Sequence, residues 1–381
     1  MATTTLISSH VLIISSLFFL ISFLQLNGAH ELKVCGFQAI YAFGDSLTDT
    51  GNAMFLTYPY GMTNPNQTGR ASDGLLIVDY IAQSAGLPLL NPSGDKNATF
   101  QSGADFAYSG ITVLNDKFHN KSNIFRGYVP DFNLQSEIKA FKTHLKSFCK
   151  NPKTLECKKK MESSLFFLWM GINDYNYAIA DGGIEAIPYL KTIEQAKKLK
   201  LVPTVVKHII RALKKLMSYG ATQVLVLGLP PYGCSPYFLT PQSKNSSAVY
   251  DEHQCLKDYN DYLMYHNIYL QEALGSLQNE NPNANIVYGD TYKAMRTILA
   301  EHTKYGIEML SQACCGVGGK YHFTGNITKL CGRPDVPFCS DPSKHIFFDH
   351  LHFTQNMNEK MAGLLIQDIL PKLKCNATGK R

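Results

Sequence analysis

The sequence predicts an α/β fold in three layers, with helices on both faces of a central parallel sheet. Short apolar runs alternate along the chain with longer stretches of helical periodicity, a rhythm that is typical of strand–helix–strand units. The short runs are continuously apolar, as expected for strands that are buried on both faces. Ligands of such open sheets bind beyond the carboxyl ends of the strands, so we expect the chemistry in the residues that follow each strand.

Eight segments carry a clear pattern, and each is predicted from its length and periodicity. Four short apolar runs are expected to be strands: 38–43, 165–170, 223–227 and 285–288. Four longer stretches with helical spacing are expected to be helices: 75–85, 205–219, 254–277 and 355–370. Gly86, Gly220 and Pro371 directly follow three of the helical stretches, as is typical of helix ends. No linker or internal repeat divides the pattern.

The composition allows a packed core and does not indicate nucleic-acid binding. Hydrophobic residues make up 45% of the 381 residues and charged residues 17%, which is typical of a globular protein. The formal net charge of +6 is weak for this length. Basic residues gather only in short runs such as 158–160, which we interpret as solvated surface.

The first 29 residues are predicted to be a signal peptide. Residues 11–26 are almost wholly apolar and lead into Asn27-Gly28-Ala29. A run of this length is short for crossing about 30 Å of hydrocarbon and suits the apolar region of a cleaved signal. The alternative is a retained anchor, because no Lys or Arg precedes the run. With cleavage near Ala29, residues 30–381 form a single mature domain without a stable membrane anchor.

Cysteines and glycosylation sequons agree with export, to the cell exterior or the vacuole. The ten cysteines are Cys35, Cys149, Cys157, Cys234, Cys255, Cys314, Cys315, Cys331, Cys339 and Cys375. Three pairs lie close enough in sequence to close loops, although connectivity cannot be read from sequence: Cys149/Cys157, Cys234/Cys255 and Cys331/Cys339. The sequence contains no pair of C-x-x-C knuckles, so the cysteines do not indicate a zinc site. The six N-x-S/T sequons predict glycosylation at Asn66, Asn97, Asn120, Asn245, Asn326 and Asn376.

A candidate nucleophile follows the first predicted strand. Gly44-Asp45-Ser46 stands at a tight strand-to-helix turn, which Gly44 permits. Such a turn lifts the Ser46 hydroxyl above the sheet edge and places its backbone N–H at a helix start, where negative charge is stabilised. We expect Asp45 to cap that helix rather than to take part in catalysis.

The C-terminal part of the chain supplies a candidate base with an orienting carboxylate. A serine nucleophile needs both groups. Asp349 and His352 are three residues apart, so one turn of helix or loop can bring the carboxylate to Nδ1 of the imidazole. Nε2 would then be free to take the proton of Ser46. His345 and His350 are less suitable, since His350 is adjacent to Asp349 and would point elsewhere in most backbones.

Candidate oxyanion donors follow further strands or apolar segments. Asn173 comes after the run at 165–170, and its side-chain amide is able to donate to an oxyanion. A backbone N–H near Gly110, at the end of a short apolar segment, is the second candidate. The alternative is that Asn173 and Asp174 only form a polar turn. The functional interpretation is favoured because each candidate stands where a strand is expected to end.

Eight sequence blocks spread over the chain carry a family resemblance. They are FGDSLTDTGN (43–52), GRASDGLLIVDYIA (69–82), GADFAYSG (103–110), LWMGINDYNYA (168–178), GLPPYGCSP (228–236), CLKDYNDYLMYHN (255–267), ACCG (313–316) and FFDHLHFT (347–354). In this order they resemble the plant branch of the GDSL esterase/lipase family, part of the SGNH hydrolase superfamily. The resemblance covers about residues 37–370, and the alkaloid esterases of the family look especially similar over 228–267 and in ACCG.

The resemblance implies a flavodoxin-like α/β/α sandwich and a serine carboxylic-ester hydrolase that needs no metal or organic cofactor. It makes Ser46 the nucleophile, His352 the base and Asp349 the residue that orients the base. The oxyanion hole would comprise the backbone N–H groups of Ser46 and Gly110 and the side-chain amide of Asn173.

Three positions depart from the family pattern. Ile172 replaces the second glycine before Asn-Asp, Asp105 replaces an asparagine, and His350 replaces the glycine of the aromatic-Asp-Gly-x-His motif. Glycine tolerates backbone angles that histidine does not. We therefore expect the change at 350 to alter the loop that presents His352.

The predicted function is hydrolysis of a short acyl or methyl ester of a small specialised metabolite such as an alkaloid, by a monomer that binds no nucleic acid. One alternative is an acyltransferase that passes the Ser46-bound acyl group to an alcohol or amine, which would differ in how well the site excludes water. Another is a catalytically silent ligand-binding protein on this fold. Residues 55–72 and 117–132 are candidate walls of the pocket, although aromatic-rich loops of this kind also pack at surfaces.

Overall fold

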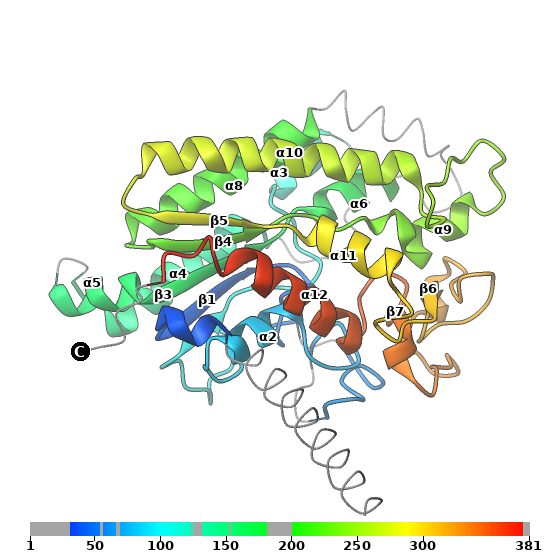
Figure 1. Ribbon diagram of the computed structural model, residues 1–381, viewed down its shortest axis with the longest axis horizontal. Helices are drawn as coiled ribbons and strands as arrows, with labels where there is room; N and C mark the ends of the chain where they lie inside the picture. The colour runs from blue at the N-terminus through cyan, green and yellow to red at the C-terminus, as the bar shows by residue number, and fades with distance from the viewer. Residues whose placement is uncertain are drawn as a thin grey trace, which may run out of the picture.

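Five parallel strands form the centre of the computed structural model, in the order β2-β1-β3-β4-β5 (Figure 1). They are β1 (Ala39–Gly44), β2 (Gly103–Asp105), β3 (Ser164–Trp169), β4 (Gln223–Leu227) and β5 (Asn285–Gly289). The structure describes residues 31–53, 56–65, 69–122, 124, 132–151, 154–180 and 200–375. The predicted signal peptide and the sequons at Asn66 and Asn376 lie outside these residues. All four predicted strands are confirmed, and β2 is an additional one.

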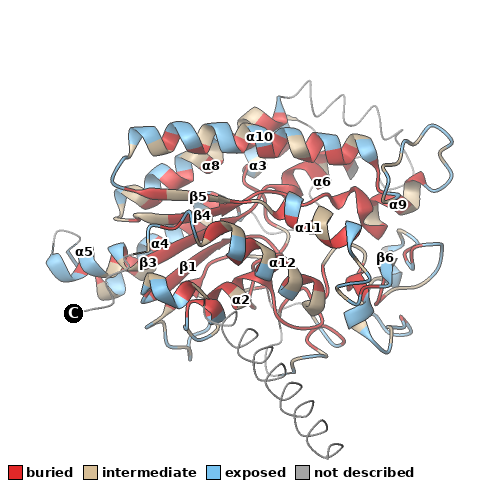
Figure 2. Cartoon of the chain, in the orientation of Figure 1, coloured by how far each residue is buried: buried red, intermediate tan, exposed pale blue. Residues whose placement is uncertain are grey.

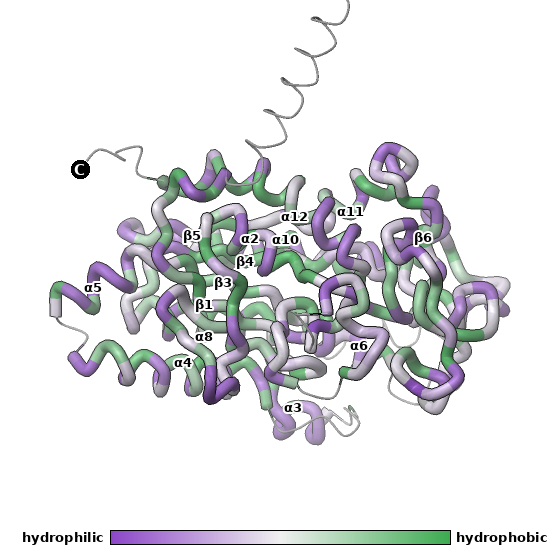
Figure 3. The backbone as a smooth tube through the Cα atoms, turned by 90° about the horizontal axis from the view of Figure 1, so that it is seen from below, coloured by the Kyte–Doolittle hydropathy of each residue, from purple (hydrophilic) through white to green (hydrophobic). Residues whose placement is uncertain are grey.

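The strands are apolar throughout because helices cover both faces of the sheet. β1 and β3 pair in register from Ala39 opposite Ser164 to Gly44 opposite Trp169, and every residue of both strands is buried (Figure 2). The tube in Figure 3 is largely hydrophobic along these central strands. The parallel register brings the ends of β1 and β3 to the same edge of the sheet, where the site residues follow.

Helices form the two outer layers. α8 and α10 lie together on one face, where α4 also packs against α8, while α2 and α12 pack against each other on the opposite face (Figure 1). The predicted three-layer α/β/α sandwich is therefore confirmed. The α-helices are α2 (Ile77–Ser84), α3 (Asp116–Lys121), α4 (Leu134–Phe148), α5 (Leu155–Glu162), α6 (Ile172–Ala180), α8 (Leu201–Ser218), α9 (Pro236–Gln242), α10 (Lys257–Glu280), α11 (Thr291–Ala300) and α12 (Gln355–Ile369). Short 3₁₀-helices are η1 (Glu31–Cys35), η2 (Tyr232–Cys234), η3 (Ile327–Lys329) and η4 (Pro342–Lys344).

The sequence predicted no element between residues 85 and 165, where the structure has β2, α3, α4 and α5. α4 is amphipathic: Leu134, Ile138, Phe141 and Leu145 are buried and recur at helical spacing, with polar residues between them (Figure 3). β2 spans three residues, which is too short for a periodic pattern. It forms because Gly103 lets the chain approach β1, since a Cβ at this position would lie 1.8 Å from the Ile40 carbonyl oxygen.

A second, two-stranded parallel sheet consists of β6 (Met309–Ala313) and β7 (His345–Phe347). Five disulfides join the ten cysteines: Cys35–Cys375, Cys149–Cys157, Cys234–Cys255, Cys314–Cys339 and Cys315–Cys331. The pairs 149/157 and 234/255 are as suggested by spacing. The suggested pair 331/339 is wrong, because the adjacent Cys314 and Cys315 after β6 each take one of these cysteines. Within the described ranges, no helix has the length and apolarity to cross a membrane.

Candidate active site

The turn after β1 carries Ser46. Gly44 is required there, because a Cβ would lie 2.5 Å from the carbonyl oxygen of Trp169 in β3. The Asp45 carbonyl accepts hydrogen bonds from Thr48 N–H at 3.0 Å and Asp49 N–H at 2.9 Å. Asp45 Oδ1 accepts from Leu47 N–H at 3.1 Å, and burial raises the pKa of Asp45 to about 7. Asp45 therefore holds a turn.

The helix that was expected after Ser46 does not form. Asp49 is the reason, because its carboxylate accepts the N–H groups of residues 51, 52 and 53 at 2.9, 2.6 and 3.1 Å and holds them in a loop. Asp49 Oδ2 also accepts from the backbone and hydroxyl of Ser109 at 2.8 and 2.9 Å. The turn that carries Ser46 is thus tied to the segment that contains Gly110.

Asp105, which stands where the family has asparagine, adds to this connection. One carboxylate oxygen accepts from Thr50 N–H at 2.7 Å and the other from Ala107 N–H at 3.0 Å. Burial raises the pKa of Asp105 well above its usual value. The bond to Thr50 joins the two loops, while the bond to Ala107 lies within the segment of Asp105 itself.

Ser46, His352 and Asp349 form one line of hydrogen bonds at the carboxyl edge of the sheet. His352 Nε2 lies 2.8 Å from Ser46 Oγ, and His352 Nδ1 lies 2.7 Å from Asp349 Oδ2. Ser46 is 7% exposed and Asp349 is fully buried, while the His352 side chain is 15% exposed. The structure thus brings Ser46 into contact with His352, which lies 306 residues later in the sequence.

The Asp349 carboxylate is held by more donors than the sequence indicated. Its Oδ1 accepts the backbone N–H groups of Leu351 and His352, both at 2.7 Å, and its Oδ2 accepts the Tyr60 hydroxyl at 2.6 Å. Burial alone would raise the pKa of Asp349, but the neighbouring histidines and these hydrogen bonds lower it. Sequence reasoning missed Tyr60, since no local pattern connects residues 289 positions apart.

The environment of His352 favours its protonated form. Burial alone would lower the pKa of this imidazole, but the Asp349 carboxylate outweighs burial and raises it. The ring is therefore a stronger base than an isolated histidine, while the short contact to Ser46 Oγ lets it take a proton directly.

His350 fits its loop without strain. Neither residue 350 nor 351 has a positive φ, so the backbone here is one that histidine adopts readily. The His350 ring stacks on Phe323, with centroids 4.7 Å apart and planes 12° apart, and its carbonyl accepts from Tyr237 N–H at 2.9 Å. His345 instead lies in β7 with Nδ1 3.2 Å from the Gln312 carbonyl oxygen.

A cavity of about 510 Å³ opens over Ser46. Gly110, Asn173, His350 and His352 line it together with Ser46. Of the two loops expected to wall the pocket, the first contributes residues 56 and 71, and none of the described residues within 117–132 lines it. The size is suited to a small molecule.

Two backbone donors and one amide are available at this cavity. Among the described residues, the N–H groups of Ser46 and Gly110 donate no hydrogen bond. Asn173 stands in the first turn of α6 rather than in a polar turn, and its Nδ2 donates to the Ile111 carbonyl at 2.9 Å. This bond uses one of its two amide hydrogens and fixes the amide beside the cavity.

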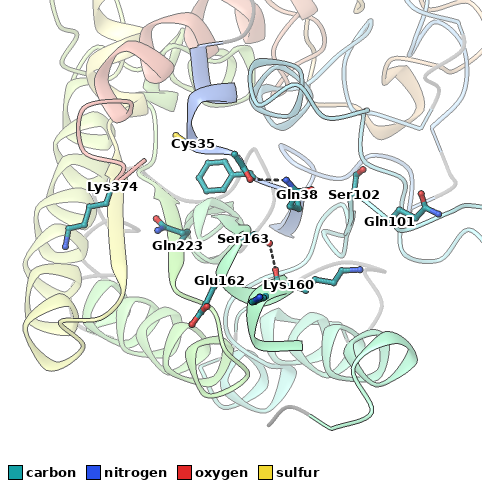
Figure 4. Close-up of a pocket in the computed structure, with 12 residues that line it drawn as sticks. Cys35, Gln38, Gln101, Ser102, Lys160, Glu162, Ser163, Gln223 and Lys374 are labelled. Carbon is teal, nitrogen blue, oxygen red and sulfur yellow. Dashed lines mark hydrogen bonds between the residues drawn. The ribbon is translucent and has the colours of Figure 1, made fainter. Parts of the chain in front are cut away.

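A larger cavity of about 780 Å³ lies away from Ser46, at the amino ends of the strands (Figure 4). Gln38, which precedes β1, and Gln223, which begins β4, line it with Lys160 and Lys374. Size therefore does not single out the candidate site, whereas the smaller cavity contains the hydrogen-bonded pair of Ser46 and His352. The part of the chain that the structure describes holds no group of three side chains suited to a metal ion.

A model of the GDSL-like lipase/acylhydrolase family matches residues 40–365. The chain belongs to this family. Acetylajmalan esterase 2 of Rauvolfia serpentina is 38% identical over 371 residues, which cover 93% of this chain and 96% of that protein. A GDSL esterase/lipase of Arabidopsis thaliana is 36% identical over 379 residues, 95% of this chain and 91% of that protein. The resemblance that the eight sequence blocks carried is confirmed.

Membership in the GDSL family makes the chain a carboxylic-ester hydrolase. A solved structure of a lipolytic G-D-S-L family protein from Veillonella parvula DSM 2008 covers 88% of this chain and 99% of that chain, with 12% identity and a TM-score of 0.33. This likeness is too remote to argue from. The fold assignment rests on the sheet topology and the family match.

Proposed function

We propose that the protein hydrolyses an ester of a small specialised metabolite through an acyl-enzyme on Ser46. The observation that carries this proposal is the continuous line of hydrogen bonds from Asp349 through His352 to the Ser46 hydroxyl. This line ends in a cavity of about 510 Å³. A serine with an adjacent base and an orienting carboxylate is the arrangement that acyl transfer requires.

In the first half of the reaction, Ser46 Oγ attacks the ester carbonyl carbon while His352 Nε2 takes the hydroxyl proton. Asp349 remains ionised and stabilises the imidazolium. The N–H groups of Ser46 and Gly110 and the Asn173 amide donate to the tetrahedral oxyanion, and each such donor contributes about 2.7–4 kcal/mol. The oxyanion then collapses, the ester C–O bond breaks, and His352 gives its proton to the leaving alcohol.

In the second half, water replaces the alcohol. His352 takes a proton from this water, whose oxygen attacks the acyl carbon of the Ser46 ester. The second tetrahedral oxyanion collapses in the same hole, and His352 returns the proton to Ser46 Oγ. The acid is released, and the site is restored without a cofactor.

A short acyl group on a small alcohol is the substrate class that we favour. The cavity is in the size range of small-molecule sites. The printed name of the relative from Rauvolfia serpentina describes an esterase of an acetylated compound, acetylajmalan. Both observations support an ester of a specialised metabolite such as an alkaloid.

We also propose that the protein enters the secretory pathway with residues 1–29 as a cleaved signal and residues 30–381 as the mature glycoprotein. Five disulfides support this route, because such bonds persist in oxidising compartments. Asn97, Asn120 and Asn326 are exposed and accessible to glycosylation, and Asn245 is half-buried. N-terminal sequencing of the protein secreted by plant cells tests the cleavage after residue 29. A fall in its mass on glycosidase treatment tests the glycosylation.

Hydrolysis of p-nitrophenyl acetate, butyrate and palmitate tests the main proposal. We expect turnover of the short esters by the wild type and none above background by Ser46→Ala. Addition of an acceptor alcohol distinguishes hydrolysis from acyl transfer, because a transferase would form the new ester at the expense of the free acid. Equal turnover in Ser46→Ala would contradict the proposal.

A further inference from the structure

Asn176 is a second asparagine at the cavity that the proposed reaction does not use. It stands three residues after Asn173 on α6, so the two side chains share one face of the helix. Both residues line the cavity over Ser46. Asn176 is only 4% exposed. Any role of its amide must therefore lie inside the protein or the cavity.

Tyr259 of α10 fixes the orientation of this amide. The Tyr259 hydroxyl donates to Asn176 Oδ1 at 2.6 Å, and Tyr259 is fully buried. Burial raises the pKa of Tyr259 well above its usual value, so the hydroxyl stays protonated and continues to donate. With Oδ1 occupied in this way, the Nδ2 group of Asn176 is directed away from Tyr259.

The Asn176 Nδ2 group has no acceptor. Among the described residues, Asn176 is the one asparagine with a fully buried Nδ2 atom that lacks a hydrogen-bond partner. Asn173 Nδ2 donates to the Ile111 carbonyl, and Asn267 Nδ2 donates to the Leu229 carbonyl at 2.8 Å. Buried donors are normally satisfied, since an unsatisfied one destabilises the fold. A buried donor that is held in place by Tyr259 and has no acceptor, in a residue that lines the cavity over Ser46, indicates a ligand contact.

We propose that Asn176 is a specificity-determining residue whose Nδ2 donates a hydrogen bond to a second acceptor oxygen of the substrate. This inference rests on the proposed ester hydrolysis at Ser46. Because residues three apart on a helix have Cβ atoms about 5–6 Å apart, the acceptor lies about one helical turn from the ester carbonyl at Asn173. The substrate class is an ester that carries a further carbonyl, ether or hydroxyl oxygen at this distance.

Paired esters that differ in one oxygen test the inference. On the acyl side, p-nitrophenyl 4-oxopentanoate is compared with p-nitrophenyl pentanoate. On the alcohol side, 3-acetylphenyl acetate is compared with 3-ethylphenyl acetate. For each pair, the ratio of kcat/KM is measured in the wild type and in the variants, so that the intrinsic reactivity of each ester cancels. A change in one pair alone locates the acceptor on that side of the ester.

We expect Asn176→Leu to lower the oxo-to-plain ratio about tenfold in one pair, because one buried hydrogen bond of a neutral donor is lost. Asn176→Asp, which keeps the Tyr259 bond but does not donate when ionised, should lower the ratio at least as much. Tyr259→Phe releases the amide and should lower the ratio by a smaller factor. Tyr265→Phe, an exposed tyrosine on the same helix, is the matched control and should retain the wild-type ratio.

If Asn176→Asp kept the wild-type oxo-to-plain ratio of kcat/KM in both ester pairs, the inference would be overturned. The same holds if kcat/KM fell equally for the oxo ester and the plain ester of a pair. The aspartate variant is isosteric, so it keeps the test valid if Asn176→Leu fails to fold. Absence of hydrolysis of every ester by a folded wild type would instead contradict the proposed function. The two failures are therefore distinguishable.

Discussion

The Tyr60 hydroxyl donates to Asp349 Oδ2 over 2.6 Å, and the same oxygen lies 2.7 Å from His352 Nδ1. The Tyr60 ring also packs edge-on against Phe348, with centroids 5.3 Å apart. The loop after the nucleophile turn thus contacts the loop that carries the base. We propose that Tyr60 is a positioning residue, because it contacts His352 only through the Asp349 carboxylate.

Replacement of Tyr60 by phenylalanine should lower kcat/KM about tenfold, since a hydrogen bond to a charged group is lost. Without the Tyr60 hydrogen bond, the Asp349 carboxylate attracts the protonated His352 ring more strongly. The apparent pKa of His352, which sets the acid limb of the pH profile, should therefore rise. The check is a pH profile of kcat/KM beside Tyr58→Phe, which changes an exposed tyrosine of the same loop. A wild-type profile and rate in Tyr60→Phe would show that the contact is only structural.

The pH dependence of hydrolysis should follow His352. The pKa of this imidazole is raised, and only its neutral form accepts the Ser46 proton. Activity should therefore be lost as the pH falls through a value above the ordinary histidine value of 6.5. Asp349→Asn should move this inflection to lower pH and reduce kcat by about 10³–10⁴-fold. An inflection that does not move in Asp349→Asn would contradict the assigned pair.

The ion pair between Arg70 and Asp79 should be necessary for stability. Arg70 Nε and Nη2 donate to the two oxygens of Asp79 at 2.7 and 2.8 Å, and both side chains are almost fully buried. Arg70→Met leaves a buried carboxylate unpaired, which should lower the free energy of unfolding by about 3–5 kcal/mol. Urea denaturation measures this change.

A matched control for Arg70→Met is Lys257→Met, which breaks the exposed pair with Asp261 on α10. Its unfolding free energy should stay within about 0.5 kcal/mol of the wild type. If the two variants lost similar amounts of unfolding free energy, the claim that the buried pair matters more than the exposed pair would be wrong.

The disulfide Cys315–Cys331 should support activity as well as stability. Cys315 N–H donates to the Phe348 carbonyl at 2.6 Å, immediately before Asp349. The double serine variant of this pair should lose about 2–5 kcal/mol of stability and part of its turnover.

The double serine variant of Cys149–Cys157 is the control for that experiment. This bridge lies at α4 and α5, at the end of the molecule remote from β6 and β7 (Figure 1). Its loss should reduce the melting temperature without a comparable fall in kcat. If both double variants lose turnover equally, the bridge at Cys315 has no special relation to the loop of His352.

The sequence predicted the parts of the fold that leave a local pattern. The apolar runs of β1, β3, β4 and β5 and the periodic stretches of α2, α8, α10 and α12 are such parts. The candidate residues Ser46, His352 and Asp349 could be proposed from the sequence because each belongs to a short motif. Ser46 and Asn173 lie at one edge of the central sheet because they follow the neighbouring parallel strands β1 and β3. Asp349 and His352 follow β7 of the separate two-stranded sheet, so their approach to Ser46 could not be predicted from the central sheet.

The remaining features depend on side-chain contacts that leave no periodic pattern in the sequence. The helix expected after Ser46 is replaced by a loop because Asp49 accepts three successive N–H groups and two groups of Ser109. The contacts of Tyr60 and Arg70 also form only in the folded chain. Spacing alone misassigned Cys331 and Cys339, since the adjacent pair after β6 takes one of them each. None of these contacts has a periodic signature in the sequence.

The central claim is that Ser46 forms a covalent acyl-enzyme. The most direct measurement is peptide mass spectrometry of the mature glycoprotein after treatment with a fluorophosphonate, which reacts covalently with activated serines. We predict an adduct on the peptide that contains Ser46, its absence in Ser46→Ala, and slower formation in His352→Ala. An unmodified Ser46 in protein that hydrolyses p-nitrophenyl acetate, or an adduct on another residue that alone abolishes this activity, would contradict the account.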